Sequence, residues 1–438
     1  MSGGCGTNTC GGSAVVRSSG FSSAHLPFVD ALCSLSSDVD PDWTMISAGL
    51  LSLRVADAWA QPGEITDDEL ALRITAVAPV VDAIRDDDEL RDALRALVAE
   101  LGPRHQHHEV ERALLAYGRA LEQRARWALA LDVYASLIEQ HALRASPATP
   151  IHNEIEALVR IAECHRHRAE WTRAEETFAH AAQRAALAGD SAAALRARCY
   201  GASVTAERGD WDAADAQLTA VEAEAERANC GDLSALARHG LAHVAFLRGD
   251  VERAARLAFD ALDDLRDPRE RDRALIDVAA AFAELGVRSA ARDAQLIISA
   301  TTQDAYVRWT SLINLMEIAA ADREQPAFEQ YRRMLAAPAQ RLPPRLGGYF
   351  HFYSAGGARA FGDTETARDE YRRALGIATR ARLGPLARDS AAALRALDAA
   401  PPLPPPDAPP ARAPTPATAS IAGALARMRE AVLPDAPR

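Results

Sequence analysis

Histidines and cysteines are the residues of this sequence whose types and spacing could bind a metal ion or act as nucleophiles. His239 and His243 lie four residues apart, so on a helix their rings would share one face and could hold one ion. No glutamate stands between them in the H-E-x-x-H form, and no third ligand is evident. We therefore interpret them as helix-surface histidines. Three further groups are the run His105, His107 and His108, the cluster Cys164, His165 and His167, and the C-x4-C pair Cys5 and Cys10.

Each of these groups also has an explanation without a metal. The run after Pro103 is typical of a polar turn, the cluster at 164–167 of a helix face, and Cys5 and Cys10 of free thiols in a small, polar tail. The alternative, a redox or metal site, stays open for Cys5 and Cys10. On balance the sequence predicts no metal site and no cofactor.

Other catalytic signatures are missing from the sequence. It contains no lysine, so its 49 Lys+Arg residues are all arginine. This excludes the lysine of a P-loop, the lysine of a kinase and a Schiff-base lysine. No nucleophile elbow, paired carboxylates in an apolar setting or glycine-rich phosphate loop is evident. We therefore expect a protein that is not an enzyme and has no catalytic residues.

Composition restricts the partners and the compartment. The formal net charge is −12, which argues against general binding of nucleic-acid phosphate. No stretch of 18 apolar residues suits a membrane span, and the N-terminus lacks the features of a secretory signal. Six scattered cysteines fit a reducing cytoplasm better than a disulfide framework.

A ten-residue unit recurs along the chain and sets the elements that would carry any site. Residues 209–218 read GDWDAADAQL, and related segments occur at 125–134, 169–178, 249–258 and 362–371. Each begins with a small residue and has an alanine five positions later, a pattern that predicts a tight turn leading into a helix. The anchor alanines lie 44, 40, 40, 37, 36 and 40 residues apart, and they are Ala130, Ala174, Ala214, Ala254, Ala291, Ala327 and Ala367.

The segments before these anchors complete a longer pattern. Leu114, Tyr117, Gly118 and Leu121 precede Ala130, in the order large, small, large and then alanine. This order resembles the tetratricopeptide (TPR) pattern W-x2-L-G-x2-Y…A-x3-F, although the spacing exceeds the usual ~34 residues. The resemblance implies an all-α chain: an α-solenoid of about seven TPR-like helical hairpins, with helices at its N-terminus that cover the first repeat.

The same analysis divides the chain into five parts. A Gly/Ser-rich tail (1–20) precedes an N-terminal helical region (21–115), in which Thr66 to Glu69 form a capping box. The TPR-like solenoid is predicted at 116–398 and a Pro-rich linker at 399–419. The last part, 420–438, would be a short amphipathic helix capped by Ser420, and its 420–433 segment could dock on this solenoid, bind elsewhere or stay frayed.

The function implied by the resemblance is the binding of a protein or peptide segment along the concave groove of the solenoid, as an adaptor or scaffold. Glu163 and Ser203 occupy positions between packing residues of first helices, where side chains would face the groove. The segment 349–353 adds aromatic rings of the kind that anchor ligands. Two alternatives remain: a regulator whose repeats sense a ligand or peptide, and an enzyme or enzyme subunit with a His/Cys site. The predicted groove residues are Arg160, Arg166, Tyr200, His239, His243, Phe246, Trp309, Tyr349, Phe352 and Arg359.

Overall fold

The computed structural model describes most of the chain between residues 25 and 433. The described ranges are 25–35, 41–61, 63, 65–84, 89–102, 106–124, 126–144, 151–336, 342–381, 383–399 and 415–433. The predicted tail at 1–20 with Cys5 and Cys10, residue His105, and residues 400–414 of the predicted linker lie outside them.

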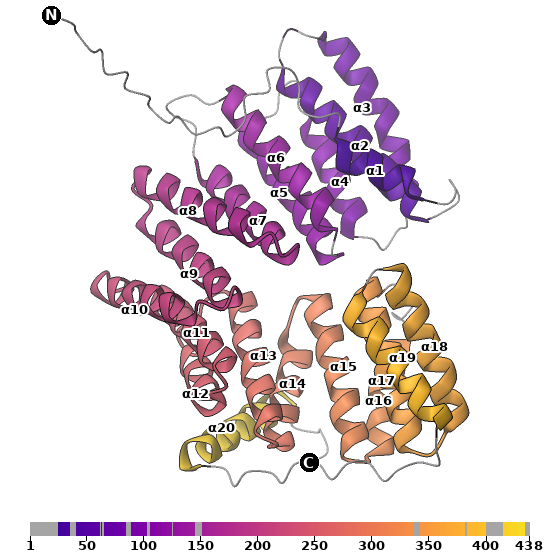
Figure 1. Cartoon of the computed structure of the whole chain (residues 1–438). Helices are drawn as coiled ribbons and strands as arrows, with labels where there is room; N and C mark the ends of the chain where they lie inside the picture. Colours follow the sequence, from indigo (N-terminus) through magenta and orange to yellow (C-terminus); the bar gives the residue numbers. More distant parts are fainter. Residues whose placement is uncertain are drawn as a thin grey trace, which may run out of the picture. The chain divides into compact units, whose positions relative to one another are not determined.

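Within the described ranges the chain forms twenty α-helices, which confirms the all-α prediction (Figure 1). None of these helices has both the length and the hydrophobicity needed to cross a bilayer. Their bounds are α1 Leu26–Cys33, α2 Pro41–Ala60, α3 Asp67–Asp82, α4 Glu89–Glu100, α5 His107–Gln123, α6 Trp127–Arg144, α7 His152–His167, α8 Trp171–Leu187, α9 Ser191–Glu207, α10 Trp211–Arg227, α11 Gly231–Leu247, α12 Val251–Ala261, α13 Pro268–Glu284, α14 Arg288–Thr301, α15 Ala305–Ala321, α16 Gln325–Ala336, α17 Pro344–Ala360, α18 Thr364–Arg380, α19 Gly384–Ala399 and α20 Pro416–Val432.

The repeated unit marks the entry into the second helix of each hairpin. Gly209 and Gly249 adopt positive φ values of 94° and 79°, which glycine accepts without steric cost. The next residue, Asp210 or Asp250, caps the following helix by accepting a hydrogen bond from a backbone N–H three residues on. The glycine thus turns the chain, and the aspartate fixes the first residue of the helix.

Seven hairpins follow one another from α5/α6 to α17/α18, as the repeat spacing predicts. In six of them the anchor alanine is the fourth residue of the second helix and is at most 3% exposed. An alanine at this position lets the neighbouring helix approach closely. These six anchors are Ala130, Ala174, Ala214, Ala254, Ala291 and Ala367.

Helix α16 departs from this rule, and the predicted anchor Ala327 is displaced by one residue. The fourth residue of α16 is Phe328, which is 2% exposed. A large ring fits there because Gly357 of α17 lies against it. A Cβ added to Gly357 would come within 2.1 Å of Phe328 Cζ and 2.2 Å of Cε2. The missing side chain on α17 therefore compensates for the large residue on α16.

We expect Gly357→Ala to destabilise this part of the chain by about 1–3 kcal/mol, because the buried ring would have to leave its packed position. Urea unfolding followed by circular dichroism measures the change. In Gly357→Ala/Phe328→Leu the smaller side chain should relieve most of the clash. If Gly357→Ala is as stable as the original chain, the close approach of α16 and α17 is wrong.

The helices group into two compact units that divide within α7. Unit 1 comprises Met1–Glu122 and Arg126–Ile161, and unit 2 comprises Gln123–Ala125 and Ala162–Arg438. The predicted start of the solenoid, residue 116, falls inside α5. The helices before α5 and the first hairpin, α5/α6, belong to unit 1 together.

Unit 1 contains a buried charged cluster that ties α1 to α2 and α6. His25, just before α1, is 2% exposed. Its Nδ1 lies 2.7 Å from Asp132 Oδ2, and its Nε2 lies 2.8 Å from Asp57 Oδ2. Ser136 Oγ also donates a hydrogen bond of 3.1 Å to Asp57.

A side-chain cap begins helix α3 in the same unit. Thr66 Oγ1 accepts a hydrogen bond from the Glu69 backbone N–H, as the capping box predicts.

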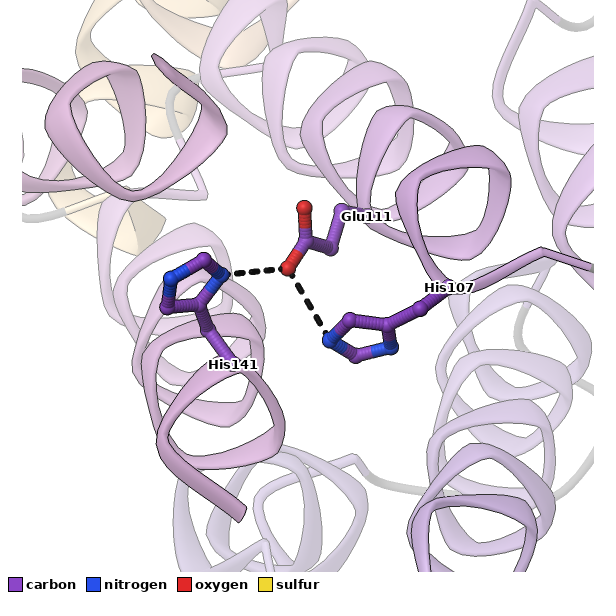
Figure 2. A group of neighbouring side chains, drawn as sticks. All are labelled: His107, Glu111 and His141. Atoms are coloured by element: carbon purple, nitrogen blue, oxygen red, sulfur yellow. Dashed lines mark hydrogen bonds and ion pairs between the residues drawn. The ribbon is translucent and has the colours of Figure 1, made fainter. Parts of the chain in front are cut away.

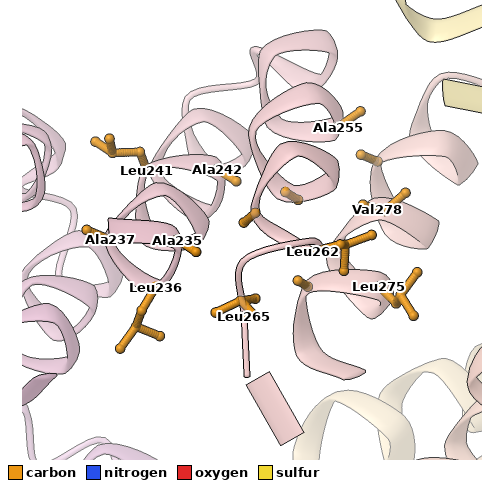
Figure 3. Close-up of a cluster of buried hydrophobic side chains, with 14 of the residues drawn as sticks. Ala235, Leu236, Ala237, Leu241, Ala242, Ala255, Leu262, Leu265, Leu275 and Val278 are labelled. Atoms are coloured by element: carbon orange, nitrogen blue, oxygen red, sulfur yellow. The ribbon is translucent and has the colours of Figure 1, made fainter. Parts of the chain in front are cut away.

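In unit 2 a continuous apolar core runs through successive hairpins from α9 to α14 and includes residues of α20. Figure 3 shows part of it, where the alanines of α11 and α12 let leucines fill the space between these helices and α13. Such small residues allow close approach, and the larger side chains exclude water between the helices. Residues of this part of the core include Ala235, Ala237, Leu241, Ala242, Ala255, Leu262, Leu265, Leu275 and Val278.

The C-terminal helix α20 belongs to unit 2 and packs against α14 and α12 (Figure 1). It begins at Pro416 with Thr415 as its N-cap, so the predicted cap at Ser420 is five residues too late. Ile421 and Leu425 enter the apolar core, while Val432 on the same helix is 38% exposed. Arg429 Nε lies 3.2 Å from Asp293 Oδ1 on α14.

Candidate binding groove

Four successive first helices of unit 2 line one cavity. The C-terminal turns of α7 and the helices α9, α11 and α13 enclose about 210 Å³, and α11 contacts both α9 and α13. We call this cavity the inner groove. Its lining residues are Glu163, Arg166, Cys199, Tyr200, Ser203, Glu207, Leu236, His239, Gly240, His243, Glu270, Arg273, Ile276 and Asp277.

Arg166 is the central cation at the α7 side of the groove. Its Nη2 donates a hydrogen bond of 2.8 Å to Glu163, and its Nη1 donates one of 2.8 Å to Glu207 on α9. Glu163 is only 7% exposed. A buried carboxylate needs such a partner, because desolvation of an unpaired charge is costly. The fork of one guanidinium therefore bridges two neighbouring first helices.

The α13 side of the groove carries a second polar network. Tyr200 on α9 donates its hydroxyl to Glu270 Oε1 over 3.0 Å, and Arg273 approaches the same oxygen at 3.2 Å. His239 Nε2 on α11 lies 2.8 Å from Asp277 Oδ2. The Tyr200–Glu270 and His239–Asp277 contacts join residues 70 and 38 positions apart, and they hold polar side chains of α9, α11 and α13 in place.

The charges of the groove shift the pKa values of its residues. Burial would raise the pKa of Glu163, but the charges of Arg166 and Arg273 and the hydrogen bond from Arg166 lower it to about 2. Burial and the nearby charge of Arg166 lower the pKa of His167, which follows Arg166 on α7 but does not line the groove, to about 4, so this imidazole is neutral at pH 7. Burial raises the pKa of Tyr200 well above its ordinary value. Glu163 therefore stays ionised while Tyr200 keeps its proton to donate.

Two lining residues decide what the groove can do chemically. Burial raises the pKa of Cys199 to about 12, so its thiol is protonated at neutral pH and is a poor nucleophile. His243 is half-buried, and among the described residues its Nε2 has no hydrogen-bond partner. A ligand in the groove could provide that partner, since a buried polar atom without one is costly. The groove thus suits binding better than thiol chemistry.

The structure brings together four of the ten residues predicted for the groove, which are Arg166, Tyr200, His239 and His243. Arg160 belongs to unit 1, where its Nε lies 2.9 Å from Glu156. Arg359 is exposed on α17. The four remaining aromatic residues pack against neighbours in unit 2, and their role in binding stays a prediction. Phe246 packs on the core shown in Figure 3, Trp309 and Tyr349 pack on the core of α15–α17, and the Phe352 ring meets the Tyr371 ring edge-on at 5.4 Å.

Helix α13 supplies groove residues that the sequence analysis missed. Asp277 lies between the packing residues Leu275 and Val278, and Glu270 and Arg273 precede them on the same helix. The rule that identified Arg166 and Tyr200, positions between packing residues on a first helix, would also have selected them.

Comparison with known proteins returned distant structural likenesses only. No protein-family model matches the sequence, and no curated protein matches it. The structure is similar to NprR in complex with its cognate peptide NprX, with 12% identity and a TM-score of 0.44 over 81% of this chain and 97% of that one. It is also similar to apo RapI (10%, TM-score 0.39, 63% and 99% covered) and to the apo form of the quorum sensor NprR from B. thuringiensis (11%, TM-score 0.36, 86% and 97% covered). At these values the likenesses do not say what this chain binds.

Proposed function

We propose that the inner groove binds an extended protein or peptide segment, so that the chain serves as an adaptor or scaffold. The observation that carries the proposal is the groove itself, to which four successive first helices contribute polar side chains around one cavity. Repeat proteins use such extended surfaces to hold their partners. The scattered cysteines favour the cytoplasm as the compartment in which the protein acts.

The charge of the groove indicates the chemistry of the segment. Four carboxylates and two guanidiniums line it, which gives a formal charge of −2 with neutral histidines. A segment with a cationic side chain or a free amino terminus would complement this charge. Leu236, Ile276 and the Tyr200 ring offer apolar contacts beside these charges. We therefore expect preferred segments to combine an arginine or lysine with an apolar residue.

A peptide library displayed on phage and selected on the full-length chain tests the proposal. Selected peptides, remade with a fluorescent label, should lose affinity at least tenfold for Ser203→Trp, because the indole would fill the cavity. Tenfold corresponds to about 1.4 kcal/mol of binding free energy. His243→Ala should also weaken binding, because it removes the Nε2 atom that has no hydrogen-bond partner among the described residues.

Thr219→Trp is the matched control, because Thr219 is an exposed hydroxyl residue on α10 and does not line the groove. It should bind the selected peptides as the original chain does. Peptides that bind Ser203→Trp with unchanged affinity would contradict the proposed site. Selection of acidic peptides would contradict the charge argument.

A further inference from the structure

Unit 1 contains a compact cluster of two imidazoles and a carboxylate that the groove does not involve (Figure 2). His107 and Glu111 lie one turn apart on α5, and His141 lies on α6. His141 Nδ1 is 2.7 Å from Glu111 Oε1, and His107 Nε2 is 3.0 Å from the same oxygen. Glu111 and His141 are 1% and 5% exposed. Three potential ligand atoms thus converge in the interior of the unit.

The distances of the cluster suit a small divalent cation. Atoms that share a tetrahedral zinc at bonds of about 2.1 Å lie about 3.4 Å from one another. The three ligand atoms here lie within 4.8 Å of one another, and the two contacts to Glu111 Oε1, at 2.7 and 3.0 Å, are about 0.4–0.7 Å shorter than the tetrahedral separation. Small rotations of the side chains would therefore make room for the ion.

His107 gives a second, independent sign of a missing ligand. Both of its ring nitrogens are buried, and neither has a hydrogen-bond partner of acceptable geometry within the described part of the chain. Nε2 instead makes an ion-pair contact of 3.0 Å with Glu111 (Figure 2). The Trp59 ring stacks on the imidazole at 5.8 Å and 16° and fixes its plane. An ion would satisfy a nitrogen that is otherwise costly to bury.

The residues around the cluster are arranged as outer-shell partners. Asn153 Nδ2 donates a hydrogen bond of 2.8 Å to Glu111 Oε2, which leaves Oε1 for the cluster. Glu154 Oε2 lies 3.6 Å from His141 Nε2, on the opposite side of the ring from the nitrogen that faces Glu111. Metal-binding histidines commonly present their second nitrogen to a carboxylate in this way. The amide and the second carboxylate would orient both ligands.

The negative charges of the cluster also favour a bound cation. Glu111 and Glu154 bring two negative charges into a site where both are less than a tenth exposed. Buried charges are paired or coordinate metals. Two protons, one on each imidazole, would neutralise the site, and so would one dication bound by neutral imidazoles.

We propose that unit 1 binds one divalent transition-metal ion of the zinc class through His107, Glu111 and His141, with Glu154 and Asn153 as outer-shell partners. Two nitrogens and one oxygen are a ligand set that zinc accepts, with water in the fourth position. The ion would join α5 to α6 and stabilise the fold of unit 1, because a metal that binds only the folded state adds its binding free energy to stability.

Zinc binding to the full-length chain tests the proposal. The protein, stripped with a chelator, carries Cys5→Ser and Cys10→Ser so that these thiols cannot bind the added ion. Native mass spectrometry should show one zinc per chain, and calorimetric titration should give its affinity. Zinc should raise the melting temperature, and cobalt should give the visible absorption of a tetrahedral site.

Variants identify the ligands. Glu111→Gln and His141→Gln should weaken zinc binding at least a hundredfold, and Glu154→Gln about 10–100-fold, as outer-shell changes do. Circular dichroism checks that each variant is folded, and Glu154→Gln keeps the test valid if a ligand variant unfolds. His108→Gln, an exposed neighbour on α5, is the control and should change nothing. The proposal is overturned if the folded chain binds no zinc, if the ligand variants bind it equally well, or if His108→Gln weakens binding as much as they do.

Discussion

Replacing Leu425 by alanine should destabilise unit 2 by about 2–5 kcal/mol, the cost of a cavity left by a buried leucine. Leu425 of α20 has no exposed surface and belongs to the same apolar core as α11–α14. The change should speed amide hydrogen exchange in α12 and α14, the helices on which α20 packs. Exchange followed by mass spectrometry measures this helix by helix.

Val432→Ala is the control for that experiment. Val432 lies on the same helix but is 38% exposed, so its truncation should change stability by no more than about 0.5 kcal/mol. If Leu425→Ala leaves the exchange of α12 and α14 unchanged, α20 does not contribute to the stability of unit 2 in solution.

The cluster around His25 should make the stability of unit 1 depend on pH. Burial by itself would lower the pKa of His25, but the hydrogen bonds and charges of Asp132 and Asp57 raise it to about 9. The ordinary value is 6.5. Because the pKa is higher in the folded state, the stabilisation is fully present below pH 6.5 and is lost as pH rises through about 9. The difference in pKa corresponds to about 3 kcal/mol.

The comparison of the original chain with His25→Asn measures this effect. Asparagine tolerates the left-handed backbone of this position, where φ is 47°, and does not titrate. Urea unfolding at pH 6 should show a large loss of stability in the variant, and the loss should shrink by about 3 kcal/mol at pH 9.5. A loss that is the same at both pH values would show that His25 is not held as a cation between Asp57 and Asp132.

Local features of the fold could be predicted because they repeat along the chain. The glycine–aspartate turn and the alanine five positions later act within one or two helical turns, so the sequence alone reveals them. Ala174, Ala214 and Ala254 occupy equivalent positions in three hairpins, as their 40-residue spacing predicts. The exception, Phe328, depends on Gly357, which belongs to another helix. The pattern could not identify a compensation between two different helices.

The candidate site was predictable in part for the same reason. The positions between packing residues on first helices identify Arg166, Tyr200, His239 and His243, since helical periodicity sets which side of a helix they occupy. It does not say which partner each of them meets. The pairing of Tyr200 with Glu270 spans 70 residues and depends on how α9 and α13 are placed relative to each other.

The sequence by itself therefore determined the all-helical class, the number of hairpins and the helix faces that carry polar residues. These properties follow from short-range periodicity and turn chemistry. Only the tertiary structure decided that α20 packs on α12 and α14, and that His107 and Glu111 meet His141, 30 residues beyond Glu111. Those contacts depend on the packing of side chains between helices. His107, from a run that the sequence predicts to be a polar turn, becomes part of a buried cluster once α6 lies beside α5.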